Sequence, residues 1–289
     1  MASTHDIRPG SAADRLCEAV DRAGAPICVG LDPVLERIDP AAPSAPAAFE
    51  AFTMAVLDGA AGLAPAVKFQ SACFERWGSA GVAALERGMA AARQRGFIVI
   101  LDAKRGDIGI SAAHYAASAT NAGADWVTVS PYLGTETIEP FLDAGLGVFA
   151  LVRTSNPGSD ELQSARLQGG ATVAEHIAAR LAEFGAGRRG TCGLSDVGAV
   201  VGATKAADAA ALRQRMADQW FLAPGYGAQG AGADDLRPML RAAPGASAGV
   251  LVTASRSIIY PAGSGPLAER VRAATAQMAD EVRGVIDPA

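Results

Sequence analysis

A nine-residue stretch, LDAKRGDIG at 101–109, brings two acidic and two basic residues together directly after an apolar run. The five residues before Asp102 are all apolar, which predicts a buried strand. Asp102 and Lys104 are two residues apart, and side chains at that spacing leave a strand on the same face. Opposite charges within about 4–6 Å favour the ionised forms of both groups. The spacing therefore predicts a protonated Lys104 that acts as a proton donor and not as a Schiff-base nucleophile.

Charged residues also end several other apolar runs. The positions concerned are Asp32, Lys68, Arg153 and Arg256. If the runs are parallel strands of one barrel, their carboxyl ends meet at a single face, so these side chains collect there. For one strand alone, a salt bridge that caps the strand end is an equally good explanation. Contributions from several strand ends favour a reactive site.

The apolar runs also predict the fold. Eight of them alternate with Ala-rich, helix-like segments, and they span 26–32, 66–70, 97–104, 125–131, 147–155, 197–204, 220–227 and 249–257. Continuous apolar runs predict strands that are covered on both faces, and strand–helix alternation predicts a parallel sheet. Eight such units in about 250 residues fit a (β/α)₈ TIM barrel. A doubly wound sheet is the rival, but it would more often carry a glycine fingerprint where this chain has GLDP.

We therefore expect one (β/α)₈ barrel domain over residues 1–289, with its core at about 26–284 and an additional N-terminal helix at 11–23. Three segments are long for connecting loops, namely 33–46, 156–171 and 185–196. Such segments are often lids or binding loops, although simple surface insertions explain them equally well.

Composition excludes several classes of protein. Half of the 289 residues are hydrophobic, 19% are charged and the net charge is −5, which argues against disorder and against a nucleic-acid-binding surface. No apolar stretch approaches the ~20 residues that a membrane span needs, and the N-terminus lacks the apolar core of a signal peptide. The expected compartment is the cytoplasm. The four cysteines form no CxxC pair and the three histidines are far apart, so we expect free thiols, and no residue spacing indicates a zinc site.

Two further loops have the character of a phosphate site. APGYGAQG at 223–230 gives the seventh strand a Gly-rich exit, where backbone N–H groups can approach an anion. TASRSI at 253–258 gives the eighth strand an exit of small residues with Arg256. TIM barrels often bind phosphate after strands 7 and 8, and arginine suits bidentate contact with phosphate.

Together these motifs resemble the orotidine 5′-phosphate decarboxylase family, in particular its longer type 2 branch, over about residues 27–258. LDAKRGDI matches the family's Asp-x-Lys-x-x-Asp signature. Lys68 in VKFQ and Asp32 in GLDP match the lysine and the aspartate of the second and first strands. TSNPGS matches the loop that contacts the pyrimidine, and PGYGAQG and SRSI match the phosphate loops.

The resemblance implies a homodimeric barrel without metal or organic cofactor, which binds no nucleic acid or membrane. It implies conversion of orotidine 5′-phosphate to UMP and CO₂, the last step of pyrimidine (UMP) biosynthesis. Lys104 would then donate the proton to C6 of the pyrimidine, and Asp102 would face the departing carboxylate. Lys68 and Asp32 would hold the ribose hydroxyls and complete the array of charges.

The resemblance also assigns residues outside this array. Asp107 would reach into the partner subunit's site, and Ser155 would contact the base. Gln229 and Arg256 would hold the phosphate. Ser111 stands where the family usually has threonine, so a hydroxyl for ribose contact remains.

Two alternatives stay open from the sequence. The first is a metal-dependent sugar-phosphate decarboxylase or aldolase on the same barrel. Such relatives typically carry an acidic metal ligand on the second strand, where this chain has Lys68. The second is a catalytically silent barrel that only binds nucleotides, for which we would expect a lost signature residue, and none is lost.

Overall fold

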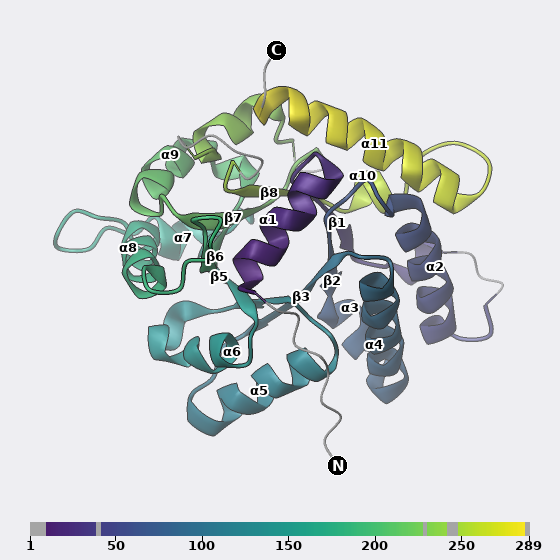
Figure 1. The fold of residues 1–289 in the computed structure, drawn as a ribbon, viewed down its shortest axis with the longest axis horizontal. Coiled ribbons are helices and arrows are strands. Elements are labelled where there is room, and N and C mark those ends of the chain that lie inside the picture. Colours follow the sequence, from purple (N-terminus) through teal and green to yellow (C-terminus); the bar gives the residue numbers. More distant parts are fainter. Residues whose placement is uncertain (1–9, 39–41, 228–229, 242–247, 287–289) are drawn as a thin grey trace.

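Eight short strands form a closed, all-parallel barrel in which each strand pairs with its neighbours in sequence order (Figure 1). A computed structural model describes residues 10–38, 42–227, 230–241 and 248–286. The strands are β1 (Ile27–Leu31), β2 (Ala66–Gln70), β3 (Ile98–Arg105), β4 (Trp126–Val129), β5 (Gly147–Arg153), β6 (Ser195–Val201), β7 (Gln219–Pro224) and β8 (Val250–Ala254). The predicted (β/α)₈ barrel is confirmed. The run that includes Arg256 is shorter than expected, because β8 ends at Ala254.

Helices surround the barrel and connect successive strands (Figure 1). They are α1 (Ala12–Ala23), α2 (Ala45–Ala60), α3 (Ser71–Glu75), α4 (Gly78–Gln94), α5 (Gly109–Asn121), α6 (Glu139–Asp143), α7 (Ser159–Gln163), α8 (Val173–Gly185), α9 (Ala206–Arg215), α10 (Arg256–Ile259) and α11 (Leu267–Ile286). A 3₁₀ helix, η5 (Ala233–Met239), takes the place of the regular helix before β8. It contains Pro238, which has no N–H to donate within a helix.

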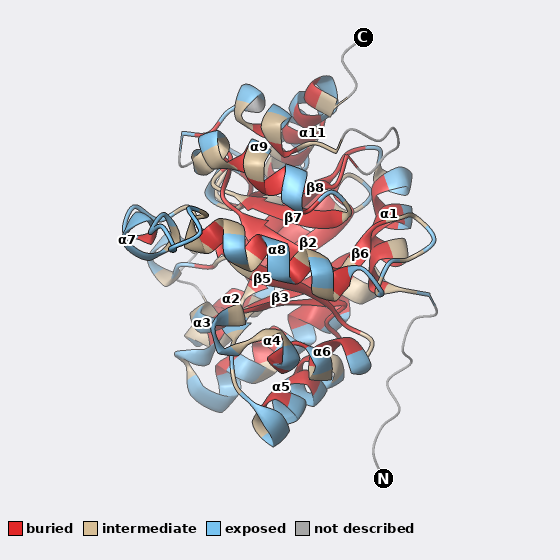
Figure 2. Ribbon diagram, turned by 90° about the vertical axis from the view of Figure 1, so that its left-hand side faces the viewer, coloured by how far each residue is buried: buried red, intermediate tan, exposed pale blue. Residues whose placement is uncertain are grey.

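The strands form the buried centre of the molecule, and the helices bury one side against them (Figure 2). The outer layer of the core lies between strands and helices and includes Phe49, Phe69 and Phe221. A second cluster fills the barrel interior, where the rings of Trp126 and Phe149 stack with centroids 4.4 Å apart. None of the helices in the described ranges is long and apolar enough to cross a membrane.

The N-terminal helix α1 lies across one end of the barrel (Figure 1), and its contacts identify that end as the amino-terminal face of the strands. The Ala13 N–H donates to the carboxylate of Asp196 at the start of β6, 2.7 Å away. Arg15 pairs at 3.8 Å with Asp125, which precedes β4. The predicted extra helix is therefore present, and it closes the amino-terminal face of the barrel, opposite to the carboxyl ends of the strands.

The Gly-rich segment 185–196 packs against this helix. The backbone N–H groups of Thr191 and Cys192 donate to the Asp14 carboxylate at 3.0 and 2.8 Å. Burial alone would raise the pKa of Asp14, but these N–H donors lower it to about 2. This long segment is thus a structural contact at the amino-terminal face and has no place in the site described below.

Candidate active site

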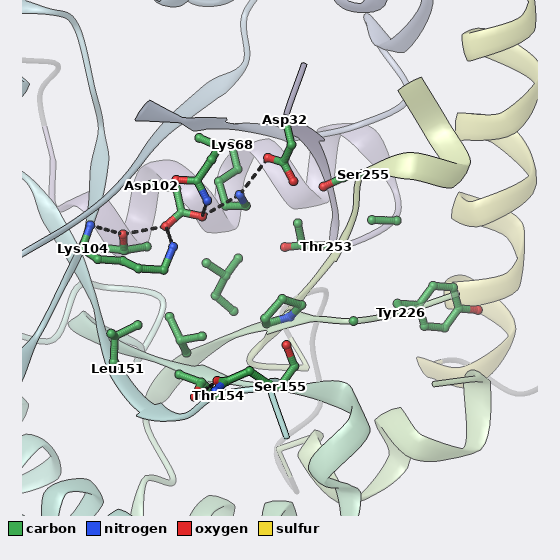
Figure 3. Close-up of a pocket in the computed structure, with 18 of the residues that line it drawn as sticks. Asp32, Lys68, Asp102, Lys104, Leu151, Thr154, Ser155, Tyr226, Thr253 and Ser255 are labelled. Atoms are coloured by element: carbon green, nitrogen blue, oxygen red, sulfur yellow. Dashed lines mark hydrogen bonds and ion pairs between the residues drawn. The ribbon is translucent and has the colours of Figure 1, made fainter. Parts of the chain in front are cut away.

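A cavity of about 460 Å³ opens at the carboxyl ends of the strands. Every strand contributes a lining residue at or just beyond its carboxyl half, and Leu151, Val200 and Leu222 add apolar side chains to the lining. Figure 3 shows the charged residues on one side of this pocket, with Thr154 and Ser155 facing them across it. The volume lies in the range of small-ligand sites. The carboxyl-terminal face is also where barrel enzymes place their catalytic residues.

Four charged side chains alternate in sign along one wall of the pocket (Figure 3). Lys68 Nζ lies 3.5 Å from Asp32 Oδ1 and 2.7 Å from Asp102 Oδ2. Lys104 Nζ lies 2.6 Å from the other oxygen of Asp102, Oδ1. The predicted juxtaposition of these four residues is therefore present. Lys68 and Asp102 are buried, whereas the Lys104 side chain is 46% exposed and so remains accessible from the pocket.

Strand register explains how separate segments deliver this array. Parallel pairing places Lys68 beside Gly30 of β1, and Gln70 beside Asp102 of β3. The β3–β4 pairing is irregular between Leu101 and Arg105, and Lys104 has a left-handed backbone with φ of 47°. Simple alternation along β3 predicted the correct face for Lys104, although the backbone there is not a regular strand.

The array holds its two buried members, Asp102 and Lys68, in their ionised forms. Burial alone would raise the pKa of Asp102, but Lys68 and Lys104 outweigh it and hold that pKa well below its ordinary value. Burial alone would lower the pKa of Lys68, but the carboxylates of Asp32 and Asp102 outweigh it and raise that pKa. A buried ion pair survives only when each charge has its partners, as these do.

This electrostatic balance predicts how stability responds to acid. Because the folded pKa of Asp102 lies below its ordinary 3.8, its ionisation stabilises the fold above that pH, and the contribution disappears as the pH falls. We expect Asp102→Asn to lower the free energy of unfolding by about 2 kcal/mol or more at neutral pH, and this deficit to shrink below about pH 4. Urea unfolding of both proteins from about pH 7 to about pH 3 measures the difference. The matched control is Asp58→Asn, on the surface; a deficit for Asp102→Asn that stays constant with pH would contradict the account.

Two polar residues of this wall were not predicted from the sequence. Thr128 of β4 donates its hydroxyl to Asp102 Oδ1 at 2.9 Å and accepts the Lys104 N–H at 2.9 Å. Gln70 of β2 donates its amide to Asp102 Oδ2 at 3.3 Å. Thr128 was the one polar position inside the run WVTV, and this interruption of an apolar strand was the available signal.

Two of the residues that were predicted to contact the base and the phosphate also line the pocket. Ser155 lines the pocket just beyond β5, and Arg256 lines it at the start of α10. Arg256 was expected at the end of the eighth strand, but it follows that strand by two residues. Its guanidinium forms no ion pair with any carboxylate in the described part of the chain, so an anionic ligand can occupy it. Gln229 lies outside the described residues.

Three other residues lie away from this pocket. Asp107 accepts the N–H of the adjacent Ile108 at 2.8 Å, and Ser111 lies in the first turn of α5; neither lines the pocket of its own chain. Arg153 ends β5, as predicted, but it does not join the other strand-end charges in lining the pocket. It is buried and pairs with Asp208 at 2.6 Å and with Asp160, so it holds the segment after β5 in place.

The fold and the pocket together define a (β/α)₈-barrel enzyme with an alternating array of fixed charges around its substrate site. Among the described residues, no group of three or more His, Cys, Asp and Glu side chains is placed to hold a metal ion. The chain belongs to the orotidine 5′-phosphate decarboxylase / HUMPS family, whose model matches residues 25–271.

Relatives of known name extend over nearly the whole chain. The orotidine 5′-phosphate decarboxylase of Rhodopirellula baltica is 38% identical and covers 94% of this chain and 99% of its own length. That of Roseiflexus castenholzii is 41% identical over 90% of this chain and 93% of its own. The solved structure of Leishmania donovani OMP decarboxylase matches with a TM-score of 0.80 and 33% identity, covering 96% of this chain and all (100%) of that one. The predicted family, a family of carboxy-lyases, is confirmed, whereas the type 2 branch remains a prediction.

Proposed function

We propose that this chain decarboxylates orotidine 5′-phosphate to UMP and CO₂, the last step of UMP biosynthesis, in the cytoplasm and without a metal or organic cofactor. Full-length similarity to proteins named for this reaction supports the substrate. The observation that carries the mechanism is the ion-paired sequence Asp32–Lys68–Asp102–Lys104 on one wall of the pocket.

Decarboxylation breaks the bond between C6 and the carboxylate, and the bonding electron pair stays on C6 as CO₂ leaves. Without a cofactor to accept these electrons, the protein must stabilise the developing negative charge itself. The Lys104 ammonium, held 2.6 Å from Asp102, is a preorganised positive charge for this purpose. Lys104 then transfers its proton to C6, which completes UMP, and regains a proton from solvent.

Whereas Lys104 stabilises negative charge on the reacting ring, Asp102 would repel the negative charge of the substrate carboxylate. Its ionised carboxylate would lie beside that of the substrate, and like charges at close range disfavour the bound ground state. Loss of CO₂ removes this repulsion, so the transition state is favoured relative to the substrate complex. Lys68 and Asp32, at the other end of the array from Lys104, would hold the ribose hydroxyls.

Binding of the phosphate supplies energy at a distance from C6. Arg256 and Gln229 would hold the phosphate, and Ser155 would contact the pyrimidine across the pocket from Lys104. Energy from remote contacts can drive loop closure over the reacting ring. The segment 153–171 is the candidate lid, because Ser155 and Asn156 at its start line the pocket.

Loss of the phosphate contact should weaken substrate binding. We expect Arg256→Ala to lower kcat/KM by about 10- to 150-fold, mainly through KM, because a charge-assisted hydrogen bond contributes about 1.5–3 kcal/mol. Free guanidinium ion should restore part of the lost activity. Steady-state kinetics with orotidine 5′-phosphate measure the effect, and Arg272→Ala on α11 is the matched surface control. An unchanged kcat/KM would remove Arg256 from the site.

We further propose a homodimer in which Asp107 and Ser111 complete the partner's site. Neither residue lines the pocket of its own chain. Beside them are exposed apolar side chains, with Ile108 at 62%, Ile110 at 75% and Tyr132 at 81% relative exposure. The loops after β3 and β4 that carry them are adjacent, since the Ser130 N–H donates to the Arg105 carbonyl at 2.7 Å. An exposed apolar patch of this kind marks an interaction surface, and a two-fold axis would bury it against itself.

A single assay distinguishes the proposed function from its two rivals, the metal-dependent enzyme and the silent nucleotide-binding barrel. Lys68 occupies the position on β2 where a metal-dependent relative needs an acidic ligand, and its ammonium would repel a divalent cation. We expect the ultraviolet absorbance of orotidine 5′-phosphate to change to that of UMP with the purified protein, equally with and without EDTA. Inhibition by EDTA would favour the metal-dependent enzyme, and binding of UMP without turnover would favour the silent barrel.

A further inference from the structure

Thr128 contacts both members of the proposed catalytic pair, the carboxylate of Asp102 and the backbone of Lys104. It lies on β4, is 1% exposed, and its hydroxyl is within 2.9 Å of Asp102 Oδ1 and of the Lys104 backbone nitrogen. A backbone N–H can only donate, so the hydroxyl oxygen accepts from Lys104. The single hydroxyl proton is then directed to Asp102. The donor and acceptor roles of the two hydrogen bonds are therefore determined together.

At Asp102, this hydrogen bond completes a full set of donors. Oδ1 accepts from Lys104 Nζ and from Thr128, and Oδ2 accepts from Lys68 Nζ and from Gln70. A carboxylate with two donors on each oxygen cannot rotate without losing a bond. The orientation of Asp102 in turn sets where the Lys104 ammonium lies.

At Lys104, the hydrogen bond holds a strained backbone. Lys104 is the only non-glycine residue with positive φ in the described parts of the chain, and its φ is 47°. Left-handed backbone costs a residue with a side chain on the order of 1–2 kcal/mol and persists only where the surroundings enforce it. The bond from the Lys104 N–H to Thr128 spans the irregular part of the β3–β4 pairing, where the regular ladder is interrupted.

We propose that Thr128 is a positioning residue for decarboxylation. It orients the Asp102 carboxylate and the left-handed backbone of Lys104 together, so that the ammonium is aimed at the reacting carbon. This inference rests on the proposed role of Lys104 as the proton donor. Thr128 itself need not touch substrate atoms, so its loss should impair the chemical step and leave nucleotide binding almost intact.

Thr128→Val removes the hydroxyl and keeps the shape of the side chain. We expect kcat to fall on the order of 10- to 100-fold, the usual effect of losing a residue that orients a functional group. KM and the Kd of UMP, measured by calorimetry, should change little. Thr128→Ser keeps the hydroxyl and should recover most of kcat. Hydrogen exchange of the peptide that contains Lys104 should quicken in Thr128→Val only.

Thr275→Val is the matched control, because Thr275 of α11 is also fully buried and donates its hydroxyl to the Val271 carbonyl at 2.7 Å, away from the pocket. It should lose stability without loss of kcat. Equal kcat values for Thr128→Val and Thr275→Val would overturn the proposal, as would a Thr128→Ser variant no better than Thr128→Val. A parallel loss of UMP binding would also overturn it, because it would indicate general disruption of the site. Failure of the wild-type protein to decarboxylate would instead contradict the proposed function, and the exchange measurement would still report on the Thr128 contact.

Discussion

Replacement of Lys104 by alanine is expected to remove almost all turnover from a protein that still folds and still binds UMP. In the proposed mechanism, Lys104 both stabilises the negative charge on C6 and donates the proton. Loss of the two roles together predicts a fall in kcat of about 10⁴-fold or more. Asp102 keeps its ion pair with Lys68 in the variant, so no isolated charge is buried and the fold should survive. A residue that acts only in the transition state affects kcat and leaves nucleotide affinity largely unchanged.

Three measurements test this expectation together. Steady-state kinetics give kcat, calorimetry with UMP gives Kd, and circular dichroism with urea unfolding reports on the fold. Arg87→Ala, which removes a surface cation that pairs with Glu50 on α2, is the control for loss of positive charge. A Lys104→Ala variant that kept more than a small fraction of the wild-type kcat would show that another group donates the proton.

The second large effect is recovery of activity when two inactive variants are combined. If Asp107 serves the partner's site, Lys104→Ala and Asp107→Ala damage sites that are built from opposite chains. A mixed dimer then contains one doubly damaged site and one intact site. Random pairing after unfolding and co-refolding in equal amounts should restore about a quarter of the wild-type activity per subunit.

The design has an internal control, because Lys104 and Asp102 belong to the same chain's array. Lys104→Ala mixed with Asp102→Ala leaves a damaged residue in both sites of every mixed dimer, so this mixture should stay inactive. Mass spectrometry establishes that mixed dimers form in both cases. If mixed dimers of Lys104→Ala and Asp107→Ala formed without recovery of activity, Asp107 would act on its own chain or in no site at all.

The proposed interface can also be tested through its apolar patch. The exposed Ile110, in the first turn of α5, and Tyr132, just after β4, follow the neighbouring strands β3 and β4, and β3 carries Asp102 and Lys104. Association through these loops would bring the partner's Asp107 near the pocket mouth. The same contact that buries the patch would then complete the site, which explains why apolar side chains are tolerated on the surface of the single chain.

Much of this architecture follows from local sequence patterns. Apolar runs without alternation, each followed by a helical segment, can bury both faces only in a parallel sheet covered by helices, and eight of them close into a barrel. Because all parallel strands end at one face, residues at their ends must gather there. Asp32, Lys68, Asp102 and Lys104 are therefore predictable as neighbours from the sequence alone.

Other features depend on register, and only the tertiary structure decides it. Thr128 reaches Asp102 because of how β4 aligns with β3, and that alignment shifts between Leu101 and Arg105. The register of the β5–β6 pairing also shifts, between Leu151 and Arg153. Beyond this shift, Arg153 is buried and pairs with Asp208 instead of facing the pocket. Periodicity assigns a side chain to a face only while the strand stays regular. Irregular pairing is set by contacts between segments distant in sequence, which one-dimensional patterns do not contain.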